Sequence, residues 1–189
     1  MLKRLIATLG VVLLGMSVSS AWARGSCAEA ANLFRKAGES ANFFKTSYGY
    51  AVFPTIAKGG AGVGGAYGKG CVYAKGKHAG DTSMVQVSIG FQLGGQGFSE
   101  IIFFQDERSF EEFTSGNFEF GADAQAVAIT LAAQAKAGST GASAGASASK
   151  HAATTAGAYY KGYATFTIIK GGLMYEVSVR GQKFRYKPL

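Results

Sequence analysis

Residues 51–73 read AVFPTIAKGGAGVGGAYGKGCVY, and seven of the twelve positions 59–70 are glycine. A G-x-G-x-x-G spacing begins at Gly60, as in dinucleotide-binding loops. Such a loop leads into a helix, whereas residues 66–73 carry too much glycine for a helix and resemble a turn into a strand. A phosphate-binding loop does not fit either, because glycine rather than serine or threonine follows Lys69. The glycines therefore indicate a structural role.

Gly60, Gly62 and Gly64 recur at every second position, so they are expected to line one face of a strand. A strand face without side chains lets another backbone or an aromatic ring pack closely, or lets the sheet bend sharply. The chain also contains 14 Phe and 9 Tyr to fill such space. This stretch predicts a strongly curved, glycine-rich antiparallel sheet or partial barrel.

The periodicity of the remaining chain makes the fold class α+β. Apolar residues spaced by three and four over 27–47 predict an amphipathic helix, and a short helix is expected near 107–115, with a capping box from Ser109 to Glu112. Residues 85–93 alternate apolar and polar side chains, which predicts a strand with Val85 and its apolar neighbours buried and the polar face exposed. Turns are expected at residues 68–70, 94–95 and 170–172.

Residues 1–23 resemble an export signal, with a basic start, an apolar run over 5–18 and the cleavage pattern AWA at 21–23. The remaining 166 residues suit a single domain, 24–189, with a low-complexity Ala/Gly/Ser segment at about 132–158. Residues 122–135 fit either strand or helix. Without Lys3 and Arg4 the mature chain has 17 basic and 11 acidic residues, a net charge of +6. This balance favours anionic partners in the periplasm or envelope rather than nucleic acid.

No catalytic, metal or cofactor motif is expected. His78 lies in an apparent loop, and His151 lies in the low-complexity segment. Neither accompanies a recognised nucleophile motif, and metal-ligand spacings such as His-x-x-x-His do not occur. An oxidising compartment would permit a disulfide between Cys27 and Cys71, but two separate buried thiols are the alternative, and sequence alone leaves the pairing open.

Several glycine-rich blocks resemble the SYLF domain family, the yeast-type actin-binding family whose bacterial members are described as lipid-binding. They are 50–54 (YAVFP), 58–60 (KGG), 62–65 (GVGG), 68–70 (GKG), 90–96, 118–124 and 170–181. The resemblance covers nearly all of 30–183. It implies a non-enzymatic module, which in eukaryotic relatives is associated with phosphoinositide membranes, through an amphipathic N-terminal helix, and with actin.

For an exported protein, the part of that function expected to apply is binding to anionic phospholipid or another anionic amphiphile. The expected protein is peripheral to the membrane and binds it through the first helix and basic residues. An envelope structural or protein-interaction role is the alternative, and the oligomeric state is left open. The candidate lipid-binding residues are Leu33, Phe34, Arg35, Lys36, Phe44, Lys45, Lys58, Lys69, Lys75, Lys77, Lys183, Arg185 and Lys187.

Overall fold

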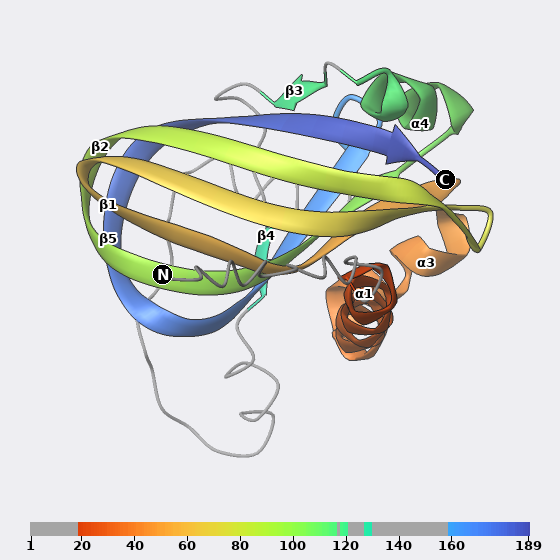
Figure 1. The fold of residues 1–189 in the computed structure, drawn as a ribbon, viewed down its shortest axis with the longest axis horizontal. Coiled ribbons are helices and arrows are strands. Elements are labelled where there is room, and N and C mark those ends of the chain that lie inside the picture. Colours follow the sequence, from red (N-terminus) through yellow and green to blue (C-terminus); the bar gives the residue numbers. More distant parts are fainter. Residues whose placement is uncertain (1–18, 117, 121–126, 130–158) are drawn as a thin grey trace, which may run out of the picture.

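Figure 1 shows the computed structural model of the chain, which describes residues 19–116, 118–120, 127–129 and 159–189. Its main elements are three long strands, β1 (Gly49–Ala74), β2 (Lys77–Phe104) and β5 (Tyr163–Pro188). They pair antiparallel in the order β1-β2-β5, and β3 (Glu119–Phe120) and β4 (Val127–Ile129) also pair with β5. The long strands curl back into a half-barrel (Figure 1). The predicted α+β fold with a strongly curved antiparallel sheet is confirmed.

Some sequence predictions fall where the structure gives no description. The low-complexity segment 132–158 and residues 1–18 of the predicted signal peptide lie outside the described residues. Of the ambiguous stretch 122–135, only Val127–Ile129 is described, as the strand β4, which runs parallel to β5.

Glycines of neighbouring strands meet in register where the sheet turns back. We call residues 49–60 of β1 its first arm and residues 63–74 its second arm. Between them the register shifts, and Gly62 has a φ of 73°, a left-handed conformation that glycine adopts without steric cost. The facing glycine pairs are Gly59 with Gly95, Gly60 with Gly94, and Gly97 with Gly171.

The glycines of the second arm allow it to lie directly against the first. A Cβ on Gly68 would come within 2.6 Å of Ile56 Cγ1, and one on Gly70 would overlap the carbonyl oxygen of Val52. Likewise, a Cβ on Gly60 would lie 2.5 Å from the Cα of Gly64 across the bend. Gly62 differs from the predicted period-two pattern, because a Cβ there would meet open space and its role is conformational.

The glycine-rich segments at 68–70, 94–95 and 170–172 do not form the predicted turns. The strands β1, β2 and β5 pass through them, because pairing with a neighbour continues and the glycines bend the ladder instead of ending it. The β1–β2 hairpin turns instead at Lys75 and Gly76, which have φ angles of 50° and 78°. Positive φ at both central residues is typical of a tight two-residue hairpin turn.

The predicted single helix over 27–47 is wrong in extent, because three helices occupy this part of the chain. They are α1 (Ser19–Lys36), α2 (Gly38–Ala41) and α3 (Phe43–Thr46). Ala37 is extended between the first two. The hydroxyl of Ser40 donates to the carbonyl oxygens of Phe34 (2.6 Å) and Ala37 (3.1 Å), so it ties α2 back to the end of α1.

The core has two layers, one on each face of the first arm. Val52 belongs to the outer layer, which α1 covers, while Phe53 belongs to the inner layer, inside the curl. Because both faces are covered, this region is apolar at successive positions, as at residues 101–104 of β2, which are all fully buried.

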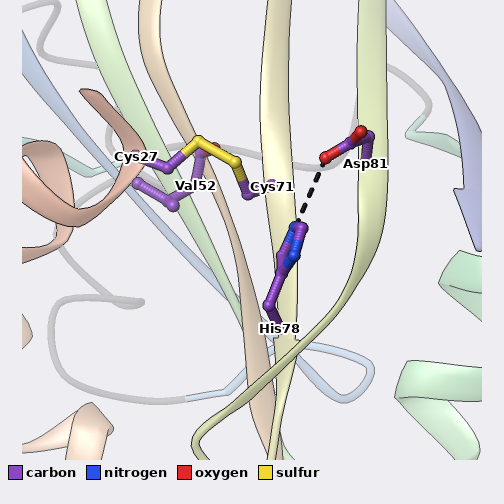
Figure 2. The surroundings of a disulfide bond; sticks show 5 residues. All are labelled: Cys27, Val52, Cys71, His78 and Asp81. Carbon is purple, nitrogen blue, oxygen red and sulfur yellow. Dashed lines mark hydrogen bonds and ion pairs between the residues drawn. A yellow bond between two sulfur atoms is a disulfide. The ribbon is translucent and has the colours of Figure 1, made fainter. Parts of the chain in front are cut away.

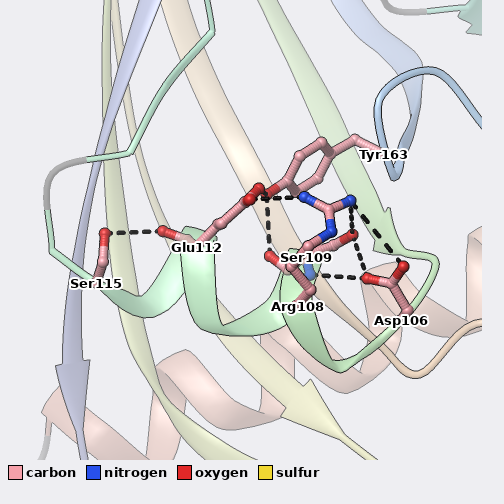
Figure 3. Close-up of polar contacts among 6 residues, drawn as sticks. All are labelled: Asp106, Arg108, Ser109, Glu112, Ser115 and Tyr163. Atoms are coloured by element: carbon pink, nitrogen blue, oxygen red, sulfur yellow. Dashed lines mark hydrogen bonds and ion pairs between the residues drawn. The ribbon is translucent and has the colours of Figure 1, made fainter.

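The helix α4 (Glu107–Thr114) closes one side of the inner layer through Phe113. Its N-cap is Asp106, which accepts hydrogen bonds from the backbone N (2.8 Å) and hydroxyl (2.7 Å) of Ser109 (Figure 3). The predicted capping box at Ser109 and Glu112 was therefore placed three residues too late. The Tyr163 hydroxyl donates to the Ser109 carbonyl (3.0 Å) and to Glu112 Oε2 (2.9 Å). Burial is the main cause that raises the Tyr163 pKa, and the contact with the Glu112 carboxylate raises it further.

Candidate functional site

The strand segment 85–89 has the predicted alternation, but its faces are reversed. Val85, Val87 and Ile89 are 50–66% exposed on the outer face of the sheet, the face turned away from the inside of the curl. Gln86 and Ser88, predicted to face solvent, are 1% exposed and lie inside. The prediction that the apolar face of this strand is buried is therefore wrong.

The close approach of the β1 arms gives a physical reason for the reversal. Gly68 and Gly70 line the inner face because larger side chains there would collide with the first arm. The polar groups that point inward find partners in this enclosed space: Gln182 Nε2 donates to Gln86 Oε1 at 3.2 Å and to Glu100 Oε2 at 3.3 Å. Their hydrogen bonds offset part of the cost of burial, so a polar inner face is tolerated.

The reversal leaves a group of large apolar side chains on the outer face, which we call the outer apolar patch. Val63 lies opposite Ile89, and Tyr67 opposite Val85, so the patch is continuous across β1 and β2. Each member is at least 50% exposed among the described residues. The patch consists of Val63, Tyr67, Val85, Val87, Ile89 and Leu93.

A group of cations borders this patch on the outer face, and we call it the basic band. Lys69 and Arg185 lie in one cross-strand row, with Ser83 between them. Lys183 lies opposite Val85 and forms an ion pair with Glu119, with 2.7 Å between Nζ and Oε1. The basic band consists of the exposed residues Lys69, Lys183, Arg185 and Lys187.

A groove of about 460 Å³ lies where the outer apolar patch and the basic band meet. Val85 and Val87 of β2 and Phe120 of β3 give it an apolar wall, while Lys183 and Arg185 of β5 supply positive charge. An apolar surface beside cations matches the two parts of an anionic amphiphile, an acyl chain and a charged headgroup.

The candidates on the helices are divided between core and surface. Phe34 is fully buried against the sheet, so its side chain belongs to the core in this conformation, whereas Leu33 is 42% exposed. Phe44 is partly buried, and the guanidinium of Arg35 lies 4.6 Å from its ring centroid. Lys36 and Lys45 are exposed. The apolar stripe of α1 therefore covers the sheet, which leaves little of it for contact with a membrane.

The four candidate lysines between residues 58 and 77 are dispersed in the structure. Lys58 is buried, only 6% exposed, on the inner side of the curl. Lys75 and Lys77 are exposed at the turn between β1 and β2, where Lys75 Nζ lies 4.8 Å from the centre of the Tyr48 ring. Lys69 belongs to the basic band instead, so the register of the sheet groups it with Lys183, Arg185 and Lys187.

A disulfide fixes α1 to the sheet. It joins Cys27 of α1 to Cys71 of β1, which is one of the two states that the sequence leaves open (Figure 2). Both residues are 1% exposed in the outer core layer. Next to the bridge, His78 Nε2 lies 3.3 Å from Asp81 Oδ1, and Figure 2 shows this pair beside Cys71.

A comparison with protein-family models matches residues 85–187 to the model Ysc84, described as a Las17-binding protein actin regulator. The matched range is more than half of the chain and includes Val85, Val87, Ile89 and Leu93 of the outer apolar patch, and Lys183, Arg185 and Lys187 of the basic band. Searches of the curated proteins and of the solved structures gave no match.

Proposed function

Because the chain belongs to the Ysc84 family of SYLF domains, whose members are binding modules, we propose that it is a lipid-binding module that docks on anionic phospholipid. The observation that carries the proposal is the outer apolar patch, six large exposed apolar side chains of β1 and β2 that lie beside the basic band. Soluble proteins rarely expose an apolar surface of this kind unless it contacts a partner or a membrane.

The expected energies suit reversible attachment. Full burial of a large apolar side chain is worth about 1.5–3 kcal/mol, so residues that are already half-buried contribute about 1 kcal/mol each on docking. A basic residue near an anionic surface adds about 1 kcal/mol. Lys183 contributes less than its neighbours because Glu119 already pairs with it. Lys69, Arg185 and Lys187 therefore supply most of the preference for anionic lipid.

The outer sheet face replaces the first helix as the main contact in this proposal. The helix α1 keeps Phe34 and Cys27 in the core, whereas no described element covers the outer apolar patch. Exposed cations of the helices, Arg35, Lys36 and Lys45, are left with a supporting electrostatic role.

We also propose that the protein is exported and works at the envelope, peripheral to the membrane. The basic start, the apolar run over 5–18 and the AWA pattern at 21–23 support export. Cleavage after Ala23 would leave Cys27 and Phe34 in place on α1. Within the described residues no helix is both long and apolar enough to cross a membrane. N-terminal sequencing of the protein from the envelope should begin at Arg24.

Co-sedimentation with liposomes tests the docking surface. The protein should bind vesicles that contain anionic phospholipid more strongly than vesicles of neutral phospholipid, with the difference shrinking as salt is raised. Arg185→Glu reverses one charge of the basic band, a change of about 2 kcal/mol or roughly 30-fold in affinity. Lys77→Glu makes the same change at the exposed hairpin turn and should have a smaller effect.

A second pair of variants separates apolar docking from simple charge attraction. Val87→Asp places a carboxylate in the outer apolar patch, and Leu33→Asp places one at a similarly exposed position on α1. Val87→Asp should lose vesicle binding and Leu33→Asp should retain most of it. Equal vesicle binding by all four variants would refute the outer apolar patch and the basic band as the docking surface. If the protein binds anionic and neutral vesicles equally and co-purifies with a protein partner, the alternative role as an envelope interaction protein is favoured.

A further inference from the structure

A bulge at the hairpin end of β2 brings His78 to the same side of the sheet as Asp81. These residues are three apart, so a regular strand would place them on opposite faces. Here the register shifts between Val72, paired with Gly80, and Tyr73, paired with His78. One extra residue on β2 therefore turns His78 outward, beside the Cys71–Asp81 pair.

Four side chains with metal-binding atoms converge at this point from three elements. Within the part of the chain that the structure describes, Cys71, His78 and Asp81 form the single cluster of such groups, with ligand atoms all within 4.8 Å of one another. The fourth is Cys27 of α1, which is bonded to Cys71. Figure 2 shows the imidazole pointing toward Asp81, with the two sulfurs close by.

We propose that reduction of the Cys27–Cys71 disulfide converts this cluster into a Zn²⁺ site with two thiolates, one imidazole and one carboxylate. Four ligands of these types are what zinc takes in tetrahedral protein sites. With bonds of about 2.3 Å to sulfur and 2.0 Å to nitrogen or oxygen, neighbouring ligand atoms lie about 3.3–3.8 Å apart. The 3.3 Å between His78 Nε2 and Asp81 Oδ1 already fits that spacing.

The surroundings suit a metal that enters from solvent and is held by buried sulfur. The Asp81 side chain is 53% exposed and the His78 side chain 17%, which gives a path inward from the carboxylate. The two cysteines are 1% exposed, so bound metal would be shielded from water on the sulfur side. Their Cα atoms are 6.2 Å apart, a separation that the two side chains can span with a metal between the sulfurs.

The disulfide and the metal site exclude each other. A dithiol reductant transfers two electrons and two protons to the Cys27–Cys71 bond, giving two thiols while the reductant becomes its own disulfide. Zinc then replaces the two thiol protons, which are released to solvent. The metal thus ties α1 to the sheet in the reduced chain, as the disulfide does in the oxidised chain.

The sequence gives no signal for this site, because its four ligands are not arranged in a recognised spacing. Cys27 is 44 residues from Cys71, and His78 is turned toward them only by the bulge. The inference does not depend on lipid binding, since none of the four residues belongs to the outer apolar patch or the basic band.

Cobalt(II) is the probe that tests the site. The purified protein is reduced under nitrogen with a phosphine, which takes oxygen from water as it opens the disulfide, and is then titrated with Co²⁺. We expect one equivalent to produce the visible bands of tetrahedral Co²⁺ and a thiolate charge-transfer band, both removed by Zn²⁺. The unreduced protein should show neither, because its sulfurs are not thiolates.

Variants and a fold measurement make the result decisive. His78→Ala should weaken Co²⁺ binding more than about tenfold, the lower limit for losing even an outer-shell partner. Lys77→Ala, the exposed neighbour, should leave it unchanged. Near-UV circular dichroism follows the fold, and Zn²⁺ should raise the melting temperature of reduced protein but not of oxidised protein. Missing charge transfer, equal affinity in His78→Ala, or no thermal effect on reduced protein would each overturn the proposal.

Discussion

Replacing Gly70 by alanine adds one methyl group where the two arms of β1 touch. The new Cβ would overlap the Val52 carbonyl oxygen and lie 2.8 Å from Cδ1 of Phe53, which is fully buried. Neither neighbour can move freely, since one is backbone and the other is packed in the inner core layer. Overpacking of this kind typically costs about 1–3 kcal/mol.

Gly65→Ala is the matched control. It lies five residues away in the same arm, on the outer face, where an added Cβ would be 3.7 Å from the Gln86 carbonyl oxygen, an ordinary contact. Alanine there removes freedom from the unfolded chain and should stabilise the protein by about 0.4–1 kcal/mol. The same chemical change is thus expected to have opposite signs at two positions.

Thermal and urea unfolding of both variants measure the effect. For a chain of this size 1 kcal/mol shifts the melting temperature by about 2–4 °C, so a cost of about 2 kcal/mol lowers it by about 4–8 °C for Gly70→Ala. Gly65→Ala should melt at or above the wild-type temperature. If Gly70→Ala is as stable as wild type, or if both variants are destabilised equally, close approach of the arms is not the reason for glycine at position 70.

Three further predictions concern the disulfide and the α4 cap. Cys71→Ser should lower the free energy of unfolding in urea by about 4 kcal/mol, because the Cys27–Cys71 bridge spans 44 residues and restricts the unfolded chain. A loss below about 1 kcal/mol would contradict this entropic account. The hydrogen bonds from Ser109 lower the pKa of Asp106 below its usual value, so the stabilisation from its carboxylate is present above that usual pKa and is lost as pH falls through the lower folded-state pKa. Asp106→Asn should therefore weaken the loss of stability between pH 5 and pH 2 in urea unfolding, and an unchanged pH dependence would argue against the cap. Tyr163→Phe removes the hydroxyl that donates to Ser109 and Glu112 and should cost about 1–3 kcal/mol in urea unfolding, whereas a neutral result would show that solvent replaces it.

Sequence reasoning predicted the curved sheet because the glycine spacing and the residue alternation are local signals. It misjudged the glycine pairs at 68–70 and 94–95 as turns, since local sequence does not reveal whether a partner strand continues beside them. The hairpin turn at Lys75 and Gly76 requires positive φ at a lysine, which turn statistics do not favour.

The candidate site was only partly predictable, for a different reason. Period-two alternation shows that Val85 and Gln86 lie on opposite faces of a strand, but it does not say which face is inside. That choice depends on Gly68 and Gly70, which bring the two arms of β1 together more than ten residues earlier in the chain. The sequence names the basic residues of the band, but only the β1–β2 and β2–β5 registers together place Lys69 in one cross-strand row with Arg185.

The same glycines therefore connect the fold to the proposed function. They narrow the inside of the curl, where Gln182 donates hydrogen bonds to one side-chain oxygen of Gln86 and one of Glu100. Val87 and Ile89 are β-branched residues that favour the strand conformation, and the alternation that turns Gln86 and Ser88 inward places them on the outer face. There they are exposed to solvent unless a partner covers them. Burial of this face against anionic lipid would remove that cost while using the neighbouring cations.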